Sequence, residues 1–171
     1  MAHPGTRDLT SGRGLRTITD VPDQAVSRAP SRDELRAWRS FLRAHSRITR
    51  LLEAELVAEQ NLSLGGYDVL VQLAEAPQRR LRMAELADAV LLSRSGVTRL
   101  VDRLEVAGLV CRERVDSDGR GVVAVLTQAG LDTLRTAART HLAGVVEHFV
   151  SLLDERELNK IGEICERLAT Q

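Results

Sequence analysis

The sequence changes its hydrophobic period at Gly108, from the 3.6-residue repeat of a helix to the two-residue repeat of a strand. Before this glycine, apolar residues recur on one face of a helix predicted over 93–107, at Val97, Leu100, Val101 and Leu104. After it, residues 109–115 and 122–126 are rich in β-forming side chains, and the Asp-Gly pair at 118–119 is a strong hairpin signal. The segment therefore predicts a helix followed directly by a β-hairpin.

The rest of the chain is predicted to be mainly helical. Aromatic residues make up only 2% of the 171 residues, so the core must be built from Leu, Val, Ile and Ala, which favours packed helices. Helical spacing and capping residues predict helices over 31–59, 63–75, 84–90, 127–153 and a last one after Asp154, with a short extended piece at 81–83. Two of the starts carry capping boxes, Ser31 with Glu34 and Asp154 with Glu157. The expected fold class is mainly α with a small β-hairpin.

Composition and simple motifs exclude several classes of protein. With 43% hydrophobic and 28% charged residues the chain is typical of a globular protein, and no apolar run is long enough to cross a bilayer. There is no apolar signal segment, and Cys111 and Cys165 form no CxxC pair, so we expect a reducing, cytoplasmic setting. A phosphate loop, GxSxG, HExxH and a dinucleotide fingerprint are all missing, so we expect no enzyme activity and no cofactor.

The N-terminal third contains two contrasting segments. Residues 1–30 hold three of the four prolines and no sustained apolar period, which predicts a flexible tail. The helix at 31–59 is amphipathic, with one face made by Leu35, Trp38, Phe41, Leu42, Ile48, Leu52 and Leu56 and the opposite arc by Arg32, Arg36, Arg39, Arg43, Arg47 and Arg50. The predicted helix is about 40 Å long, which is more than the diameter of a small domain, so part of its apolar face is expected to pack on another subunit. The arginine arc is either a solvated face or a surface that contacts phosphate or lines a cleft.

The predicted helix at 93–107 is the best candidate for a functional surface. Opposite its apolar face it carries Arg94, Ser95, Thr98, Arg99 and Asp102. Such a rod fits the major groove of DNA, where Arg reads guanine and Ser or Thr contacts bases or phosphates. Ser93 begins the helix, where free backbone N–H groups favour a phosphate, and Arg103 adds a further cation.

The hairpin tip adds a second candidate contact. Arg120 is placed to enter the neighbouring minor groove, and Asp118 would hold it in position. The formal charge is zero, with 24 basic and 24 acidic residues, so any attraction for DNA must come from such local groups. The alternative is that these arginines are ordinary residues of a solvated surface.

Several short motifs occur together between residues 86 and 130: Leu86-Ala87 with Leu92-Ser93, Val97-Thr98-Arg99-Leu100-Val101-Asp102-Arg103-Leu104-Glu105, Gly108-Leu109-Val110, Asp118-Gly119-Arg120, and Leu126-Thr127 with Gly130. In combination they resemble the winged helix-turn-helix core of MarR-type transcriptional regulators. The resemblance implies a homodimer in which residues 31–60 and 128–171 form the helical dimerisation region and residues 61–127 the DNA-binding lobe. It also implies a ligand-responsive repressor that binds a pseudo-palindromic double-stranded operator, with half-sites about one helical turn apart.

The same resemblance suggests a small aromatic or anionic effector in a cleft between the dimerisation helices and the DNA-binding lobe. The candidates are Trp38, Asp68 and either Arg94 or Arg99, but for Trp38 we favour the role of a core anchor, because the chain is so poor in aromatic residues.

Two other interpretations compete with these assignments. His141 and His148, with Glu147 or His45, could bind zinc, but their spacing is not that of a firm ligand set and we expect no metal site. A winged helix could also serve only to bind another protein, yet such an interface would be more apolar and poorer in Arg than the surface at 94–99.

Cys111 is interpreted as a small buried hydrophobe.

Overall fold

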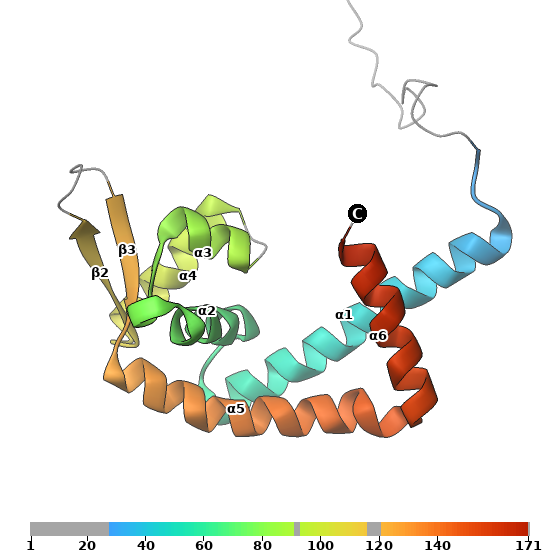
Figure 1. The fold of residues 1–171 in the computed structure, drawn as a ribbon. Helices are drawn as coiled ribbons and strands as arrows, with labels where there is room; N and C mark the ends of the chain where they lie inside the picture. The colour runs from blue at the N-terminus through green and yellow to red at the C-terminus, as the bar shows by residue number, and fades with distance from the viewer. Residues whose placement is uncertain (1–27, 91–92, 116–120, 171) are drawn as a thin grey trace, which may run out of the picture. The chain divides into compact units, whose positions relative to one another are not determined.

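The structure is a computed structural model and describes residues 28–90, 93–115 and 121–170 (Figure 1). Its elements in chain order are α1 (Arg32–Gln60), α2 (Leu64–Glu75), η1 (Pro77–Arg79), β1 (Arg80–Arg82), α3 (Met83–Ala89), α4 (Arg94–Val106), β2 (Val110–Val115), β3 (Gly121–Leu126), α5 (Gln128–His148), η2 (Val150–Leu152) and α6 (Glu155–Ala169). The chain divides into two units, Met1–Arg39 and Ser40–Gln171, so the boundary falls within α1. The predicted mainly helical fold with a small hairpin is confirmed.

In the first unit, the start of α1 is fixed by the predicted capping box. The backbone N–H of Ser31 donates to the Glu34 carboxylate at 2.7 Å, and the N–H of Glu34 donates to the Ser31 hydroxyl at 3.3 Å. Arg28 adds two hydrogen bonds to the same carboxylate, and these contacts lower the pKa of Glu34 to about 2, the Arg28 contact contributing most. Of the predicted tail, residues 1–27 lie outside the described part of the chain.

The second unit is built around one apolar core. Its fully buried members include Leu56 from α1, Leu70 and Leu73 from α2, and Leu86 from α3. The four residues predicted for the inner face of α4 are all buried: Val97, Leu100, Val101 and Leu104. Strand β3 and the first turns of α5 close this core from the other side, through Ala124, Leu126, Leu131 and Leu134.

The hairpin is part of a three-stranded antiparallel sheet of order β1-β3-β2. Strands β2 and β3 pair in register from Val110 with Leu126 to Val115 with Gly121, as the alternating pattern predicts. The extended piece expected at 81–83 is instead β1 at Arg80–Arg82, which adds a third strand beside β3. A three-residue strand has too short a repeat to be recognised by periodicity.

Where α4 meets the hairpin and α5, close backbone contacts fix the geometry. Gly108 ends the helix with a φ of 73°, a left-handed conformation that glycine adopts without steric cost. The Thr127 hydroxyl donates to the carbonyls of Gly108 and Leu109 at 2.8 and 3.0 Å, and it accepts from the N–H of Gly130 at 2.9 Å. One side chain therefore joins the end of α4 to the base of the hairpin and the start of α5.

Two predictions about the long helices α1 and α5 need correction. The helix expected to reach residue 153 ends at His148, because Phe149 leaves helical geometry with φ −133° and ψ −62°, and η2 follows. The apolar face of α1 is buried in this chain only at Leu52 and Leu56, whereas Trp38 is 55% exposed and is not a core anchor.

Cys111, which was expected to be a small buried hydrophobe, is only half-buried. Within the described ranges, every helix is too short or too polar to span a lipid bilayer.

Candidate nucleic-acid interface

Helix α4 is fixed by the burial of one face in the core and by a cap at its N-terminus, and its remaining faces are exposed to solvent. The Ser93 hydroxyl caps the helix by accepting a hydrogen bond from the N–H of Gly96 at 3.2 Å, as predicted from the sequence. Its four buried aliphatic residues anchor it in the core. The residues assigned to DNA contact on this helix are all exposed: Ser93, Arg94, Ser95, Thr98, Arg99 and Arg103. Asp118 and Arg120 lie outside the described residues.

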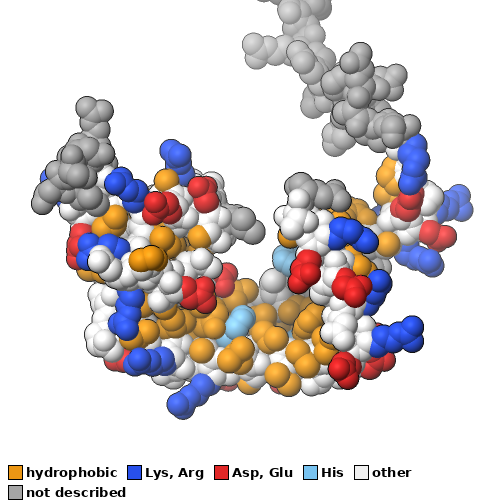
Figure 2. Space-filling model, viewed as in Figure 1, with side chains coloured by type: hydrophobic (Ala, Val, Ile, Leu, Met, Phe, Trp, Pro, Cys, Tyr) orange, Lys and Arg blue, Asp and Glu red, His pale blue; other side chains and the backbone are white. Residues whose placement is uncertain are grey.

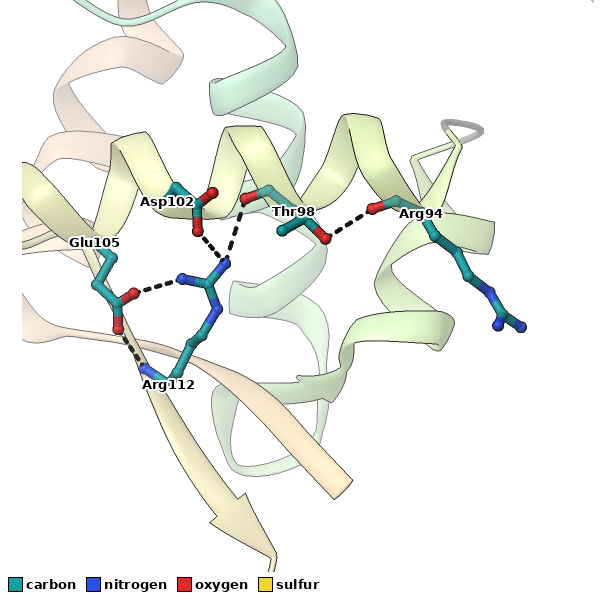
Figure 3. Close-up of polar contacts among 5 residues, drawn as sticks. All are labelled: Arg94, Thr98, Asp102, Glu105 and Arg112. Atoms are coloured by element: carbon teal, nitrogen blue, oxygen red, sulfur yellow. Dashed lines mark hydrogen bonds and ion pairs between the residues drawn. The ribbon is translucent and has the colours of Figure 1, made fainter. Parts of the chain in front are cut away.

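The side chain of Arg112, on β2, joins the hairpin to α4 (Figure 3). Its guanidinium forms ion pairs with Asp102 at 2.7 Å and with Glu105 at 2.5 Å, and it donates to the Thr98 carbonyl at 3.3 Å. The backbone N–H of Arg112 donates to the second oxygen of Glu105 at 3.0 Å. We call these four residues, Arg112, Thr98, Asp102 and Glu105, the Arg112 cluster.

The Arg112 cluster changes the charge that α4 presents. Asp102 is exposed, as expected, and its carboxylate is ion-paired with Arg112, which offsets one of the two negative charges of Asp102 and Glu105. In contrast, the guanidinium groups of Arg94, Arg99 and Arg103 form no hydrogen bond or ion pair with other residues that the structure describes. The acids of α4 are therefore paired with the hairpin, while its arginines remain available to an external anion.

The arginines do not share a single ridge. At 100° per residue, Arg99 and Arg103 lie on one flank of α4, and Arg94 projects from the opposite flank. Figure 3 shows the Arg94 side chain extending away from the Arg112 cluster. Arg99 and Arg103 line a shallow depression with Gly96, Leu100 and Asp102. Cations are thus presented on both flanks of the helix.

One predicted contact group is partly used within the helix. The Thr98 hydroxyl donates to the carbonyl of Arg94 at 2.8 Å, so only its lone pairs remain to accept a hydrogen bond. The hydroxyls of Ser93 and Ser95 contact each other at 3.2 Å, with either able to donate. Thr98 is therefore less suited to donate to a phosphate than the sequence suggested.

Arg112 is the residue of this candidate site that the sequence analysis missed. A signal was present: Val110 is buried, and the two-residue repeat of a strand puts Arg112 on the same face, toward the core and α4. Asp102 and Glu105, three residues apart, lie on adjacent turns of the facing helix. A basic residue two positions after a buried strand residue, opposite two such acids, predicts this ion pair.

Two of the residues suggested for effector binding, Trp38 and Asp68, have different surroundings. Trp38 is exposed on α1 in the first unit. Asp68, on α2, lines a small depression with Val71, Gln72, Ala89 and Val90. The residue is exposed overall, but protein atoms packed around its carboxyl raise its pKa, and His141 opposes that rise.

The histidines suggested for zinc lie in two separate environments. His141 packs against the Tyr67 ring with centroids 4.5 Å apart, and its buried Nδ1 makes no hydrogen bond among the described residues. His148 instead contacts Glu55 of α1, which is 93 residues earlier in the chain, and Glu147 lies close to both. The structure therefore places Glu147 and His148 together, with Glu55 as a neighbour that the sequence did not suggest.

Comparison with known proteins identifies the family. A model of the MarR family matches residues 60–121. The fold is similar to that of AbsC, a MarR family transcriptional regulator from Streptomyces coelicolor, with 38% identity and a TM-score of 0.74, over 85% of this chain and 100% of AbsC. It is also similar to Sco3205, a MarR family regulator from the same organism determined in complex with DNA, with 35% identity and a TM-score of 0.80, over 85% of this chain and 91% of Sco3205.

A more distant relative is the transcriptional regulator MhqR of Bacillus subtilis. It is 28% identical over 86 residues, which are 50% of this chain and 59% of MhqR, so the alignment spans less than two thirds of that relative. The capped α4, the paired β2 and β3 and the likeness to AbsC and Sco3205 over 85% of this chain lead to one conclusion: the chain belongs to the MarR family of winged helix-turn-helix transcriptional regulators.

Proposed function

We propose that this regulator binds a pseudo-palindromic DNA operator as a homodimer, with α4 as the recognition helix of each copy in the major groove. The observation that carries the proposal is the separation of charge on α4. Its exposed arginines have no partner among the described residues, whereas Asp102 and Glu105 are both ion-paired with Arg112. A helix that presents unpaired guanidinium groups from a rigid base is suited to guanine edges and phosphates.

The fixed position of α4 supports this use. The helix is anchored by four buried residues, held to the hairpin by Arg112, and joined to α5 through Thr127. A recognition helix must be held rigidly, because direct readout depends on hydrogen bonds aligned with base edges. Sco3205, which is 35% identical to this chain, has been determined in complex with DNA.

The proposed homodimer is supported by apolar side chains that this chain leaves exposed. They lie on α1 (Phe41, Leu42), α5 (Leu142, Val146), η2 (Val150, Leu152) and α6 (Ile164, Leu168). No residue of α6 is buried, although the helix is strongly amphipathic. Figure 2 shows hydrophobic side chains gathered over α5. Monomeric proteins seldom expose this much apolar surface, so a second copy is the simplest partner for these helices.

A competing interpretation, a winged helix that binds only protein, fits α4 less well. An interface core for a protein partner is depleted in charge, whereas the exposed residues of α4 include three arginines. Val106 is the one large apolar residue exposed on this helix, at 91%. The surface is therefore better matched to a polyanion.

For the effector, we propose an uncharged aromatic hydroxyl compound at Asp68. A carboxylate would repel an anionic effector but can accept a hydrogen bond from a phenol. The small depression beside Asp68 offers apolar contact through Val71, Ala89 and Val90. Screening phenols and aromatic acids for release of bound DNA tests this assignment, and release by aromatic acids alone would contradict it.

The central proposal is tested by selecting bound duplexes from random DNA and then comparing two arginine variants by fluorescence anisotropy. Arg99→Ala removes an exposed cation from α4, and we expect roughly tenfold weaker binding to the selected duplex. Arg139→Ala is the matched control, because Arg139 is also exposed but lies on α5. Equal losses in the two variants would place the DNA-binding face elsewhere.

We also propose that Arg120 contacts the minor groove, an assignment that rests on the sequence because Asp118 and Arg120 lie outside the described residues. Arg120→Ala should weaken binding and reduce the slope of log affinity against log salt by about one, because one fewer cation displaces counterions. Titrations at several salt concentrations measure this slope. An unchanged slope would remove Arg120 from the interface.

A further inference from the structure

Three ligating side chains converge where α1 meets the end of α5. Glu55 from α1 and Glu147 and His148 from α5 each offer one ligand atom, and these atoms all lie within 4.8 Å of one another. Nε2 of His148 contacts Oε1 of Glu55, and the two side chains are only 14% and 32% exposed. We call these three residues the Glu55–His148 group. It is separate from α4 and from the depression at Asp68.

The backbone of α5 makes room for the carboxylate of Glu55. Gly144 lies one helical turn before His148, and a Cβ at this position would overlap Oε2 of Glu55 and press on Leu52. The absence of a side chain at residue 144 therefore lets the carboxylate lie directly against α5. A larger residue would push Glu55 away from His148.

The position of the group along α5 also favours a cation. The helix ends at His148, where Phe149 departs from helical geometry. The unpaired carbonyls of a helix C-terminus carry a partial negative charge. Two carboxylates are added at this same end, and the described residues place no Arg or Lys in an ion pair with either of them.

We propose that Glu55, Glu147 and His148 bind a divalent transition-metal ion of the zinc class and thereby link α1 to α5. One imidazole and two carboxylates are ligands that Zn²⁺ accepts, at about 2.0–2.2 Å from the metal. Glu147 is exposed, so its side chain can rotate to bring its oxygen to bonding distance. An imidazole ligand disfavours Mg²⁺ and Ca²⁺, which prefer oxygen donors only.

The alternative is that Glu55 and His148 form only a hydrogen-bonded pair that helps α1 pack on α5. Both interpretations account for the contact between the two side chains. They differ in whether Glu147 takes part and in whether Zn²⁺ binds with a fixed stoichiometry. The proposal does not rest on DNA binding, so it can be tested without DNA, and its failure would leave the operator proposal intact.

The first test is calorimetric titration of Zn²⁺ into the full-length protein after dialysis against a chelator. We expect one Zn²⁺ per chain and at least a tenfold loss of affinity in His148→Gln, because removing a ligand costs no less than removing a residue that supports one. His45→Gln is the control, since His45 is exposed on α1 and packs near Phe41, outside the group. No Zn²⁺ binding, or equal loss in the two variants, would overturn the proposal.

A second measurement keeps the proposal testable if His148→Gln fails to fold. Co²⁺ bound to the unmodified protein should show d–d absorption without a thiolate charge-transfer band, and Glu147→Gln, a change at an exposed residue, should alter that spectrum. A thiolate band would assign the metal to Cys111 or Cys165. A spectrum unaffected by Glu147→Gln would exclude Glu147 as a ligand. Either result would overturn the three-residue site.

Discussion

At the scale of single residues, Arg112 decides how α4 and the hairpin are held together. Its side chain is 23% exposed, and its guanidinium pairs with both Asp102 and Glu105 of α4, whose side chains are partly exposed. Ion pairs at a surface contribute little by themselves, but this one forms a network that includes a backbone carbonyl and a backbone N–H. The network fixes the hairpin relative to the helix that is proposed to read DNA.

Replacing Arg112 by Ala should destabilise the protein by about 1–2 kcal/mol, because two carboxylates and the Thr98 carbonyl lose their shared donor. Arg114→Ala is the matched control, since Arg114 is exposed on the same strand and has no partner among the described residues, and should cost less than about 0.5 kcal/mol. Urea unfolding followed by circular dichroism at a fixed protein concentration measures both. Similar losses would mean that the cluster adds no stability.

Glu34 should titrate with a pKa of about 2, well below the ordinary value of 4.5, because Arg28 and Ser31 stabilise its ionised form. Its contribution to the start of α1 is then complete above pH 4.5 and is lost as the pH falls through about 2. Carboxyl chemical shifts measured by NMR across this range give the midpoint. In Arg28→Ala the midpoint should move up toward 4.5, and an unmoved midpoint would contradict the assigned cause.

At the scale of elements, the junction between the hairpin and α5 depends on close backbone contact. A Cβ at Gly130 would overlap the carbonyl oxygen of Leu109, which is backbone and cannot rotate away. The contact holds the first turn of α5 against the base of the hairpin, beside the Thr127 hydrogen bonds. Gly162, in α6, is also helical but has open space where a Cβ would be.

The two glycines should therefore respond oppositely to the same substitution. Gly130→Ala should lower the free energy of unfolding by about 1–3 kcal/mol, as expected for overpacking. Gly162→Ala should raise it by up to about 1 kcal/mol, because Ala is the better helix former. Thermal and urea unfolding of the two variants measure the changes. A tolerated Gly130→Ala would show that the junction is looser than these contacts imply.

Elements with a long repeat or a strong cap could be predicted from the sequence. The spacing of Val97, Leu100, Val101 and Leu104 placed α4 and its buried face, and the capping boxes at Ser31 and Asp154 placed two helix starts. The extended piece at β1 was predicted one residue too late and without its pairing to β3, and the break at Phe149 was missed, since three residues are too few for a period and no Gly or Pro marks the break. A periodic pattern is a property of one segment alone, whereas the pairing of β1 and the break at Phe149 depend on contacts with other elements.

For the candidate site too, the sequence predicted what depends on one element and missed what depends on two. Exposure of the arginines follows from the helical period of α4 alone. The pairing of Arg112 with Asp102, and of His148 with Glu55, depends on contacts between separate elements. Residues that act through a neighbour distant in sequence carry no local pattern, so only the assembled fold brings them together.

At the scale of the whole molecule, the exposed apolar faces of α1, α5 and α6 predict association of two copies. Leu168→Glu and Leu142→Glu each put a charge on such a face, so each should shift the protein toward the monomer. Val106→Glu is the control, because Val106 is exposed on α4, outside the proposed dimer surface. Sedimentation velocity over a range of concentrations measures the change. A monomeric unmodified protein, or a loss of the dimer in Val106→Glu, would contradict the proposed arrangement.

The claim on which the functional account depends is that two copies of α4 lie in successive major grooves of one duplex. Dimethyl sulfate methylates guanine at N7 on the major-groove edge, the atom that Arg94, Arg99 and Arg103 are proposed to approach. Footprinting on a selected duplex should show two protected guanine tracts about one helical turn, or 10–10.5 base pairs, apart from centre to centre. Unprotected guanines across the whole bound duplex, or a single protected tract, would contradict it.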